Sequence, residues 1–326
     1  MPNVLLSALP QKSDHAPVLA EEIVELLDVQ PGDTVVDGTF GAGGHAAALA
    51  AALGGRGKLI AVDRDPTVEV YFESFARSTP VPTRLLRGEF DVVFRQLAEN
   101  GVRVDRILLD LGMSSMQVDR PERGFSYAVD APLDMRMDPS APVSAADLVN
   151  TLPERDLADA FRRYGEERHA RQIARAIVAR RSQEPYSRTH DLVETIRQAI
   201  PAPRRFGDGH PAKRVFQALR IAVNDELGSL ERALPAALEL LRPGGRLAAI
   251  SFQSLEDRLV KRFLKAQVDP CTCPPDLPVC ACGLTPQMEL VTRKAVRPSP
   301  QEVADNPRSA SARLRVAQRI AEGAST

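Results

Sequence analysis

Three short apolar segments of this chain each end in an aspartate. They cover residues 34–37, 58–63 and 106–110, and their last residues are Asp37, Asp63 and Asp110. Helical patterns alternate with such segments along the first third of the chain, as expected of parallel strands joined by helical crossovers. Open α/β sheets bind their ligands at the edge where parallel strands end. The sequence therefore predicts an α/β fold with three carboxylates at its ligand-binding edge.

A long gap interrupts this series of strands. Further strand patterns cover residues 84–87, 246–252 and 312–317. More than a hundred residues separate 106–110 from 246–252, whereas a crossover between neighbouring strands takes a few dozen at most. The gap predicts that a separate unit is inserted between these two strands.

The inserted stretch differs from the rest of the chain in pattern and in charge. Because residues 144–219 have a helical pattern, we expect an all-helical subdomain there, flanked by two parts of the sheet domain at 1–143 and 220–326. Residues 151–220 contain 15 Lys or Arg and 9 Asp or Glu, although the whole chain has a net charge of −1. A nearly neutral chain has no global field that attracts nucleic acid or membrane. Any polyanion must therefore bind locally.

A row of arginines lies beside the apolar face of one expected helix in the insert. This basic ridge consists of Arg168, Arg171 and Arg175. A charged stripe on an amphipathic helix is often only a solvated face. The basic pairs 204–205 and 213–214 follow in the same insert. Taken together with the ridge, they support a polyanion-binding surface as strongly as a solvated face.

A glycine-rich loop follows the first strand. It contains Gly38, Gly41, Gly43 and Gly44 and directly precedes an alanine-rich helix. Glycine lets the backbone turn tightly and approach a ligand closely. A carboxylate at the end of the next strand, here Asp63, is placed to bind the hydroxyls of a nucleoside ribose. This order of strand, glycine loop, helix, strand and acid predicts a nucleotide-type cofactor.

The acid before the loop distinguishes between cofactors. Dinucleotide sites read G-x-G-x-x-G and bind a pyrophosphate at the helix N-terminus, whereas this loop reads G-x-x-G-x-G-G directly after Asp37. A carboxylate there would repel pyrophosphate. It suits S-adenosylmethionine, which has no phosphate and carries an amino group and a sulfonium. Asp37 is therefore a candidate partner for the cationic end of that donor, or only a cap of the following turn.

Asp110 is the candidate for contact with the methyl acceptor. It ends the strand at 106–110 beside the expected methyl donor. Its carboxylate could accept hydrogen bonds from an exocyclic amine and hold the nitrogen in line with the methyl carbon, although an acid in this position can also cap a helix. His45, where the helix after the glycine loop begins, is the histidine that we expect in the site.

Ordered motifs along nearly the whole chain carry a resemblance to a known family. They include DGTFGAGGH (37–45), AVDRDP (61–66), LLDLGMSS (108–115), ERGFS (122–126), PLDMRMD (132–138), YGEER (164–168) and SLEDR (254–258). The chain resembles the RsmH (MraW) family of bacterial methyltransferases, which methylate N4 of a cytidine in 16S ribosomal RNA. The resemblance implies a Rossmann-like sheet of the S-adenosylmethionine-dependent methyltransferases with an inserted helical domain.

The resemblance also implies a set of site residues and partners. S-adenosylmethionine contacts fall on Gly43, Gly44, His45, Asp63, Phe90, Asp110 and Gln117, and the loop pattern adds Asp37 and Gly41. The expected substrate is 16S rRNA in the small ribosomal subunit, with the target base flipped out of its stack. Phe125, Tyr127 and Phe252 are candidate stacking surfaces or ordinary packing residues.

The chain departs from the family pattern at two positions. The family commonly reads S-F-H-S-L-E-D-R where this chain has Gln253 in place of the histidine, so a histidine base is not available there. Gln253 can still hydrogen-bond the base or the RNA backbone, and we expect it to assist Asp110 in catalysis. Met116 stands where proline is frequent before Gln117.

Two other classes of function share some of these features. An NAD(P)-dependent oxidoreductase would use a similar fold, although the loop spacing and the acid before it argue against a pyrophosphate. A non-enzymatic RNA-binding assembly factor could keep the fold without the reaction. Cofactor binding and methyl transfer to rRNA distinguish the three classes.

The cysteines form a local cluster. The four in the chain are Cys271, Cys273, Cys280 and Cys282, so disulfides cannot staple the whole fold. Four thiolates can hold a structural zinc ion, but C-x₂-C is the usual spacing and C-x-C is tighter. Reduced, unligated cysteines are the alternative. No signal peptide or membrane-spanning pattern is found in the sequence, and we expect a cytoplasmic protein.

Overall fold

The computed structural model describes residues 17–200, 210–274 and 281–321. The chain divides into two compact units. The first combines Met1–Gly112 with Gly228–Thr326, and the second is Met113–Leu227. The chain therefore leaves the first unit after the strand that ends at Asp110 and returns to it more than a hundred residues later. The long gap between two strands of the sequence predicts this arrangement.

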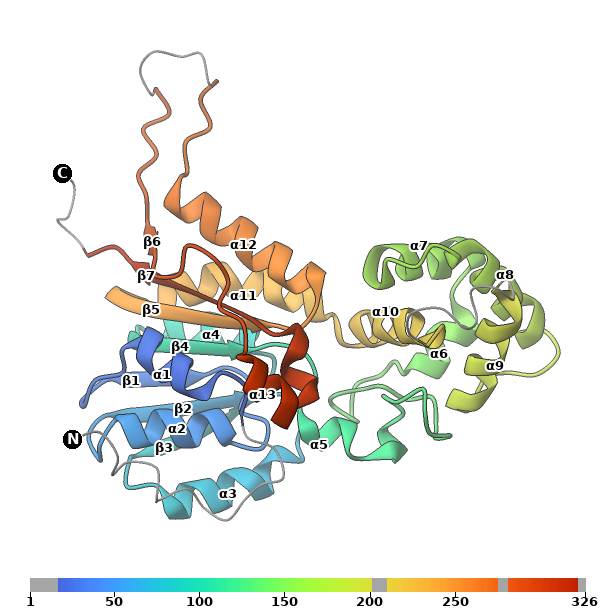
Figure 1. The fold of residues 1–326 in the computed structure, drawn as a ribbon, viewed down its shortest axis with the longest axis horizontal. Coiled ribbons are helices and arrows are strands. Elements are labelled where there is room, and N and C mark those ends of the chain that lie inside the picture. Colours follow the sequence, from blue (N-terminus) through green and yellow to red (C-terminus); the bar gives the residue numbers. More distant parts are fainter. Residues whose placement is uncertain (1–16, 201–209, 275–280, 322–326) are drawn as a thin grey trace. The chain divides into compact units, whose positions relative to one another are not determined.

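The first unit is built on a seven-stranded sheet with the order β3-β2-β1-β4-β5-β7-β6 (Figure 1). The strands are β1 (Thr34–Asp37), β2 (Lys58–Asp63), β3 (Thr83–Arg87), β4 (Val104–Asp110), β5 (Leu241–Ser251), β6 (Met288–Leu290) and β7 (Arg313–Arg319). Strands β1 to β5 pair in parallel, and β7 runs antiparallel to both of its neighbours. The expected α/β fold with a largely parallel sheet is confirmed.

The strand order places the ligand-binding crevice. The chain passes outward from β1 to β2 and β3 and then returns to the other side of β1 as β4. Ligands of open α/β sheets bind outside the carboxyl ends of the strands at such a reversal. Asp37 and Asp110 end the two strands that flank this point, and Asp63 ends the strand next to them.

Helices cover both faces of this sheet. They are α1 (Ala20–Leu27), α2 (Gly44–Ala52), α3 (Val68–Ser78), α4 (Phe90–Glu99), α11 (Glu226–Leu240), α12 (Ser254–Val268) and α13 (Pro300–Asp305). One buried cluster joins alternate residues of the central strands, including Val36, Ile107 and Leu109, to α4, α11 and α12. In Figure 1, α1 and α2 lie on the other side of the sheet from α4 and α11. Alternation follows from the strand period of two, which sends successive side chains to opposite faces.

The second unit is helical and has its own core. Its elements are α5 (Ser115–Val118), η1 (Pro121–Arg123), α6 (Ala145–Thr151), α7 (Glu154–Gly165), α8 (Ala170–Arg181), α9 (Thr189–Ala199) and α10 (Ala212–Asn224). The unit begins before the 144–219 range expected from the sequence, because the loop residues Phe125, Leu133 and Met135 are buried in its core. The buried Asn224 fastens this loop, since its side chain accepts from the N–H of Met137 and donates to the carbonyl of Met135, each at 2.8 Å.

The elements agree with the sequence patterns in most places. The Arg-Pro-Gly-Gly stretch at 242–245 lies inside β5, where the register with β4 jumps from Leu241 to Arg246. Strand β6 was not anticipated, because three residues are too few for a periodic pattern. In the described part of the chain, no helix has both the length and the apolar character that crossing a bilayer requires.

Candidate active site at the carboxyl edge of the sheet

The glycine loop passes close to the neighbouring strand. A Cβ added to Gly38 would lie 2.7 Å from Cδ2 of Leu109, so only glycine lets the chain leave β1 this close to β4. Gly43 precedes α2 with φ +82°, and a Cβ there would lie 2.8 Å from the ring of Phe40. Both positions therefore require glycine for space, and Gly43 also requires it for its backbone conformation.

Side chains and backbone fasten the loop to both neighbouring strands. The N–H of Gly41 donates to Oδ2 of Asp63 at 2.8 Å. The N–H of Asp110 donates to the hydroxyl of Thr39 at 2.6 Å. The loop is thus held between the ends of β2 and β4. Thr39 was not among the expected site residues, and its only signal in the sequence is a hydroxyl residue within the glycine loop.

Three ionisable side chains meet where the loop joins α2. The Nδ1 of His45 lies 3.4 Å from Oδ2 of Asp110 and its Nε2 lies 2.9 Å from the carbonyl oxygen of Val18, while the charges of His45 and Asp37 interact. Asp37 is fully buried and accepts a hydrogen bond from the N–H of Thr39 at 3.1 Å. The structure therefore brings together Asp37, His45 and Asp110.

The contacts of His45 favour its charged form. A carbonyl and a carboxylate are both acceptors, so both ring nitrogens must carry a proton to donate to them. Burial alone lowers the pKa of His45, but the hydrogen bond and the charge of Asp110 outweigh burial and raise the pKa to about 9. At neutral pH, His45 is therefore an imidazolium that pairs with Asp110.

The pKa values of Asp37 and Asp63 are also raised, in both cases mainly by burial. Burial raises the pKa of Asp37 to about 6, although the charge of His45 opposes the rise. Burial also raises the pKa of Asp63 to about 6, against the hydrogen bonds from the N–H groups of Asp65 and Gly41. The carboxylate of Asp63 accepts backbone hydrogen bonds from Gly41 at Oδ2 and from Asp65 at Oδ1, and the N–H of Arg64 also donates to it. Its remaining acceptor capacity fits a hydroxyl such as that of a ribose.

Two buried oxygens in this cluster lack partners among the described residues. They are Oδ2 of Asp37 and Oδ1 of Asp110. A buried carboxylate oxygen without a donor is costly, and a ligand that supplies donors or positive charge relieves that cost. S-adenosylmethionine supplies an ammonium and a sulfonium, and an acceptor amine supplies N–H groups. These orphaned oxygens fit such ligands and do not fit a pyrophosphate.

The other expected donor-contact residues lie at different places. Gly44 is the first residue of α2, and a Cβ there would be 3.3 Å from Pro17. Phe90 begins α4, and the N–H of Gly88, two residues before it, donates to the carbonyl of Asp63 at 2.9 Å. Gln117 belongs to α5 in the second unit, where it is buried and its Oε1 accepts from the N–H of Ser114 at 3.2 Å.

Gln253 has a structural role at the start of α12. It is the N-cap residue, and its amide donates to Oε1 of Glu256 at 2.9 Å. The other oxygen of this buried glutamate accepts the N–H groups of Phe252 and Gln253. Ser251, directly before Phe252, has a buried hydroxyl with no partner in the described part of the chain.

The candidate stacking residues have different surroundings. Phe125 is buried in the core of the second unit. Tyr127 stacks on His210 with ring centroids 4.6 Å apart and meets Phe216 edge-on. Phe252 is half-buried beside a small pocket of the first unit. Of the three, Phe252 is the one that follows a strand of the sheet directly.

The basic ridge and the cysteines lie away from these strand ends in the sequence. Arg168, Arg171 and Arg175 are exposed on or just before α8, and Arg175 lies 3.9 Å from Glu154. Residues 204–205 are outside the described residues, as is Cys280. The sulfur atoms of Cys271, Cys273 and Cys282 lie within 4.8 Å of one another. They form a three-cysteine cluster.

Comparison with known proteins gives consistent matches. The model of the MraW methylase family matches residues 12–320. A protein of Heliobacterium modesticaldum named ribosomal RNA small subunit methyltransferase H is 51% identical over 94% of this chain and 98% of its own. A protein of the same name from Mycolicibacterium paratuberculosis is 52% identical over 94% of this chain and 82% of its own. Among solved structures, TrmN from Thermus thermophilus matches 95% of this chain and 50% of its own at 16% identity, with a TM-score of 0.43.

Proposed function

The chain belongs to the MraW methylase family, and from that premise we propose that it transfers a methyl group from S-adenosylmethionine to the exocyclic N4 amine of a cytidine in 16S rRNA of the small ribosomal subunit. The relatives that share half of its sequence are named as small-subunit rRNA methyltransferases. The single observation that supports the proposal best is the cluster of Asp37, His45 and Asp110 at the reversal point of the sheet.

The cluster suits both ligands of this reaction. The donor would supply a methyl group made electrophilic by the sulfonium. Asp37 would bind its cationic end, and Asp63 would bind its ribose. The free Oδ1 of Asp110 is available to accept an N–H from the acceptor amine. His45 keeps the other oxygen of Asp110 engaged, so the direction of the free oxygen is fixed before the base arrives.

The chemical step is an in-line displacement. The N4 nitrogen forms a bond to the methyl carbon while the carbon–sulfur bond breaks and its electron pair stays on sulfur. The methylated nitrogen becomes strongly acidic, so Asp110 or water can take its proton after the transfer. Most of the acceleration then comes from alignment and from preorganised charge. Gln253 would hold the base or the RNA backbone and not act as a base.

We expect Asp110→Asn to lower turnover more than donor affinity. The variant keeps the shape but loses the charge that pairs with His45 and receives the proton, and losing one such group costs about 10² to 10⁴ in rate. The measurement is methyl transfer to small subunits from cells that lack the enzyme, followed by nucleoside mass spectrometry. Asp105→Asn, at the amino end of the same strand, is the matched control. Unchanged turnover in Asp110→Asn would remove this residue from the mechanism.

The same experiment separates the competing functions. Wild-type protein that yields N4-methylcytidine supports the proposal, whereas another methylated nucleoside rejects the N4 assignment. Protein that binds rRNA without transferring methyl would instead favour an assembly factor. Binding of a dinucleotide in place of S-adenosylmethionine would favour an oxidoreductase.

We also propose that a structural zinc ion binds the three-cysteine cluster, with Cys280 as the expected fourth ligand. The described sulfur atoms are close enough to share one ion, and the N–H of Ala281 lies 3.3 Å from Sγ of Cys273, a contact that stabilises a thiolate. Protein purified with zinc should hold ~1 ion per chain and lose it in Cys271→Ser/Cys273→Ser. Equal metal content in wild type and variant, measured by mass spectrometry, would reject this site.

A further inference from the structure

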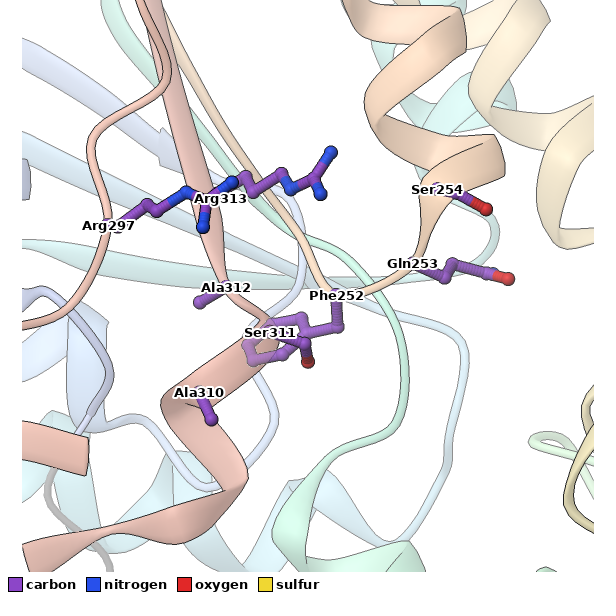
Figure 2. Close-up of a pocket in the computed structure, with 8 residues that line it drawn as sticks. All are labelled: Phe252, Gln253, Ser254, Arg297, Ala310, Ser311, Ala312 and Arg313. Carbon is purple, nitrogen blue, oxygen red and sulfur yellow. The ribbon is translucent and has the colours of Figure 1, made fainter. Parts of the chain in front are cut away.

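A small pocket lies at the carboxyl end of β5 (Figure 2). Phe252 and Ser254 line it from the β5–α12 connection, and Arg297, Ser311 and Arg313 line it from the C-terminal part of the chain. Its volume is about 110 Å³. Sites for whole drug-sized ligands begin near ~300 Å³, so this pocket takes a small chemical group and not a nucleotide.

The pocket is close to the candidate acceptor site. Asp110 pairs with Ile250 across β4 and β5, two residues before Phe252. The ring of Phe252 lies 3.7 Å from the position that a Cβ on Gly112 would take. Phe252 therefore lies beside the loop that follows Asp110 and also lines the pocket.

The charge of the pocket is positive. An antiparallel bridge pairs Val296 with Leu314, so Arg297 lies opposite Arg313. Arg313 donates to Asp257 at 2.9 Å, but Asp257 also accepts from Arg315 at 2.7 Å. One carboxylate thus faces two guanidinium groups. The side chain of Arg297 is exposed and has no ion pair with any residue that the structure describes.

Arg297 and Arg313 are neighbours beside an isolated bridge, and the one carboxylate bonded to Arg313 is shared with Arg315. An anion bound beside Arg297 and Arg313 would compensate this excess of positive charge. Guanidinium groups only donate hydrogen bonds, and their planar fork matches the oxygens of a phosphate. The small volume, the excess positive charge and the hydroxyls of Ser254 and Ser311 all fit one phosphate group.

We propose that this pocket binds one phosphodiester of the RNA strand next to the target nucleotide. The inference rests on the proposed function and extends it from the base to the backbone. A phosphate contact carries no sequence information, but it fixes the register of the strand. With the backbone held here, the flipped base is delivered past Phe252 toward Asp110.

The test is Arg297→Ala, because Arg297 lines the pocket without holding the fold through a described ion pair. Arg293→Ala is the matched control, since Arg293 is also exposed in the same segment but does not line the pocket. We expect Arg297→Ala to weaken binding of deproteinised 16S rRNA roughly 3- to 10-fold and to lower the slope of log affinity against log salt by about 0.7–0.9. Donor affinity should not change, and Arg297→Lys should keep most of the slope.

Each other outcome overturns the inference. If Arg297→Ala has the salt slope of the wild type, no phosphate is bound here. If it weakens binding to assembled subunits but not to free rRNA, the pocket contacts acidic groups of a ribosomal protein. Wild-type methyl transfer is measured in parallel, so a failure of the proposed function is seen in the wild type itself. A failure of the phosphate site is seen only in the comparison of variants.

Discussion

At the residue scale, the site depends on charges that compensate one another in a small volume. The sequence predicts Asp37, Asp63 and Asp110 at one edge, because each ends a strand of the same parallel sheet. It does not predict that His45 is an imidazolium, because that state depends on a carbonyl from Val18 and a carboxylate from Asp110. Both contacts are far apart in the sequence, so only the fold reveals them.

The raised pKa values of Asp37 and Asp63 predict how donor affinity depends on pH. Both carboxyls have a pKa of about 6 in the free protein, and the donor needs the ionised forms. Affinity should therefore be constant between pH ~7 and pH ~8 and fall as the pH drops through 6, by about tenfold per group at pH ~5. His45, with a pKa of about 9, stays charged through this window and does not contribute.

Calorimetric titration with S-adenosylmethionine at several pH values measures this effect. Asp63→Asn should bind the donor more weakly at neutral pH and should show a shallower dependence, because one of the two titrating groups is gone. Donor affinity that stays level between pH 7.5 and pH ~5 would contradict the assignment of these carboxylates to the donor site.

At the scale of elements, the glycine loop needs glycine for two reasons, its backbone conformation and its close packing against neighbouring side chains. Gly43 has a left-handed backbone and lies against the ring of Phe40. Gly54, after the same helix, also has a left-handed backbone at φ +57°, but a Cβ there would be 4.0 Å from its nearest neighbour. Substitutions at the two positions therefore distinguish the effect of backbone strain from the effect of crowding at the site.

We expect Gly43→Ala to weaken donor binding and Gly54→Ala to leave it unchanged. Both substitutions cost about 1–2 kcal/mol in the free energy of unfolding, because an alanine must adopt a left-handed conformation. Only Gly43→Ala also displaces Phe40 and the loop that holds Asp63 and Asp110. Thermal unfolding gives the stability of each variant, and titration gives its donor affinity. Equal donor affinity in both variants would show that the loop tolerates a side chain.

Some elements of this chain have a clear signal in the sequence, and others have none. The central strands were predicted within a few residues, because fully buried strands form continuous apolar runs. The polar, turn-rich segments 119–126 and 133–138 read as surface loops in the sequence, yet Phe125 and Met135 lie in the core of the second unit. Polar, turn-rich sequence conceals these buried residues, since they do not recur with a helical or strand period. Gln253 likewise gives no signal in the sequence for its bond to Glu256.

At the scale of the whole molecule, the candidate active-site carboxylates and the excess of basic residues belong to different units. The strand ends proposed to bind the donor belong to the first unit, whereas the excess of basic residues belongs to the stretch 151–220 inside the second. Each unit has its own core. A change on the exposed face of the second unit should therefore affect RNA capture without affecting donor binding.

The basic ridge provides the test of this division. Arg171→Glu/Arg175→Glu changes the local charge by four at exposed positions, and lost phosphate contacts should lower rRNA affinity by roughly tenfold or more and reduce its salt dependence. Arg56→Glu/Arg84→Glu makes the same change at exposed positions of the first unit near the amino ends of β2 and β3, and should have little effect. Filter binding with free rRNA and with subunits measures both. If the two double variants bind rRNA equally well, the ridge is only a solvated helix face.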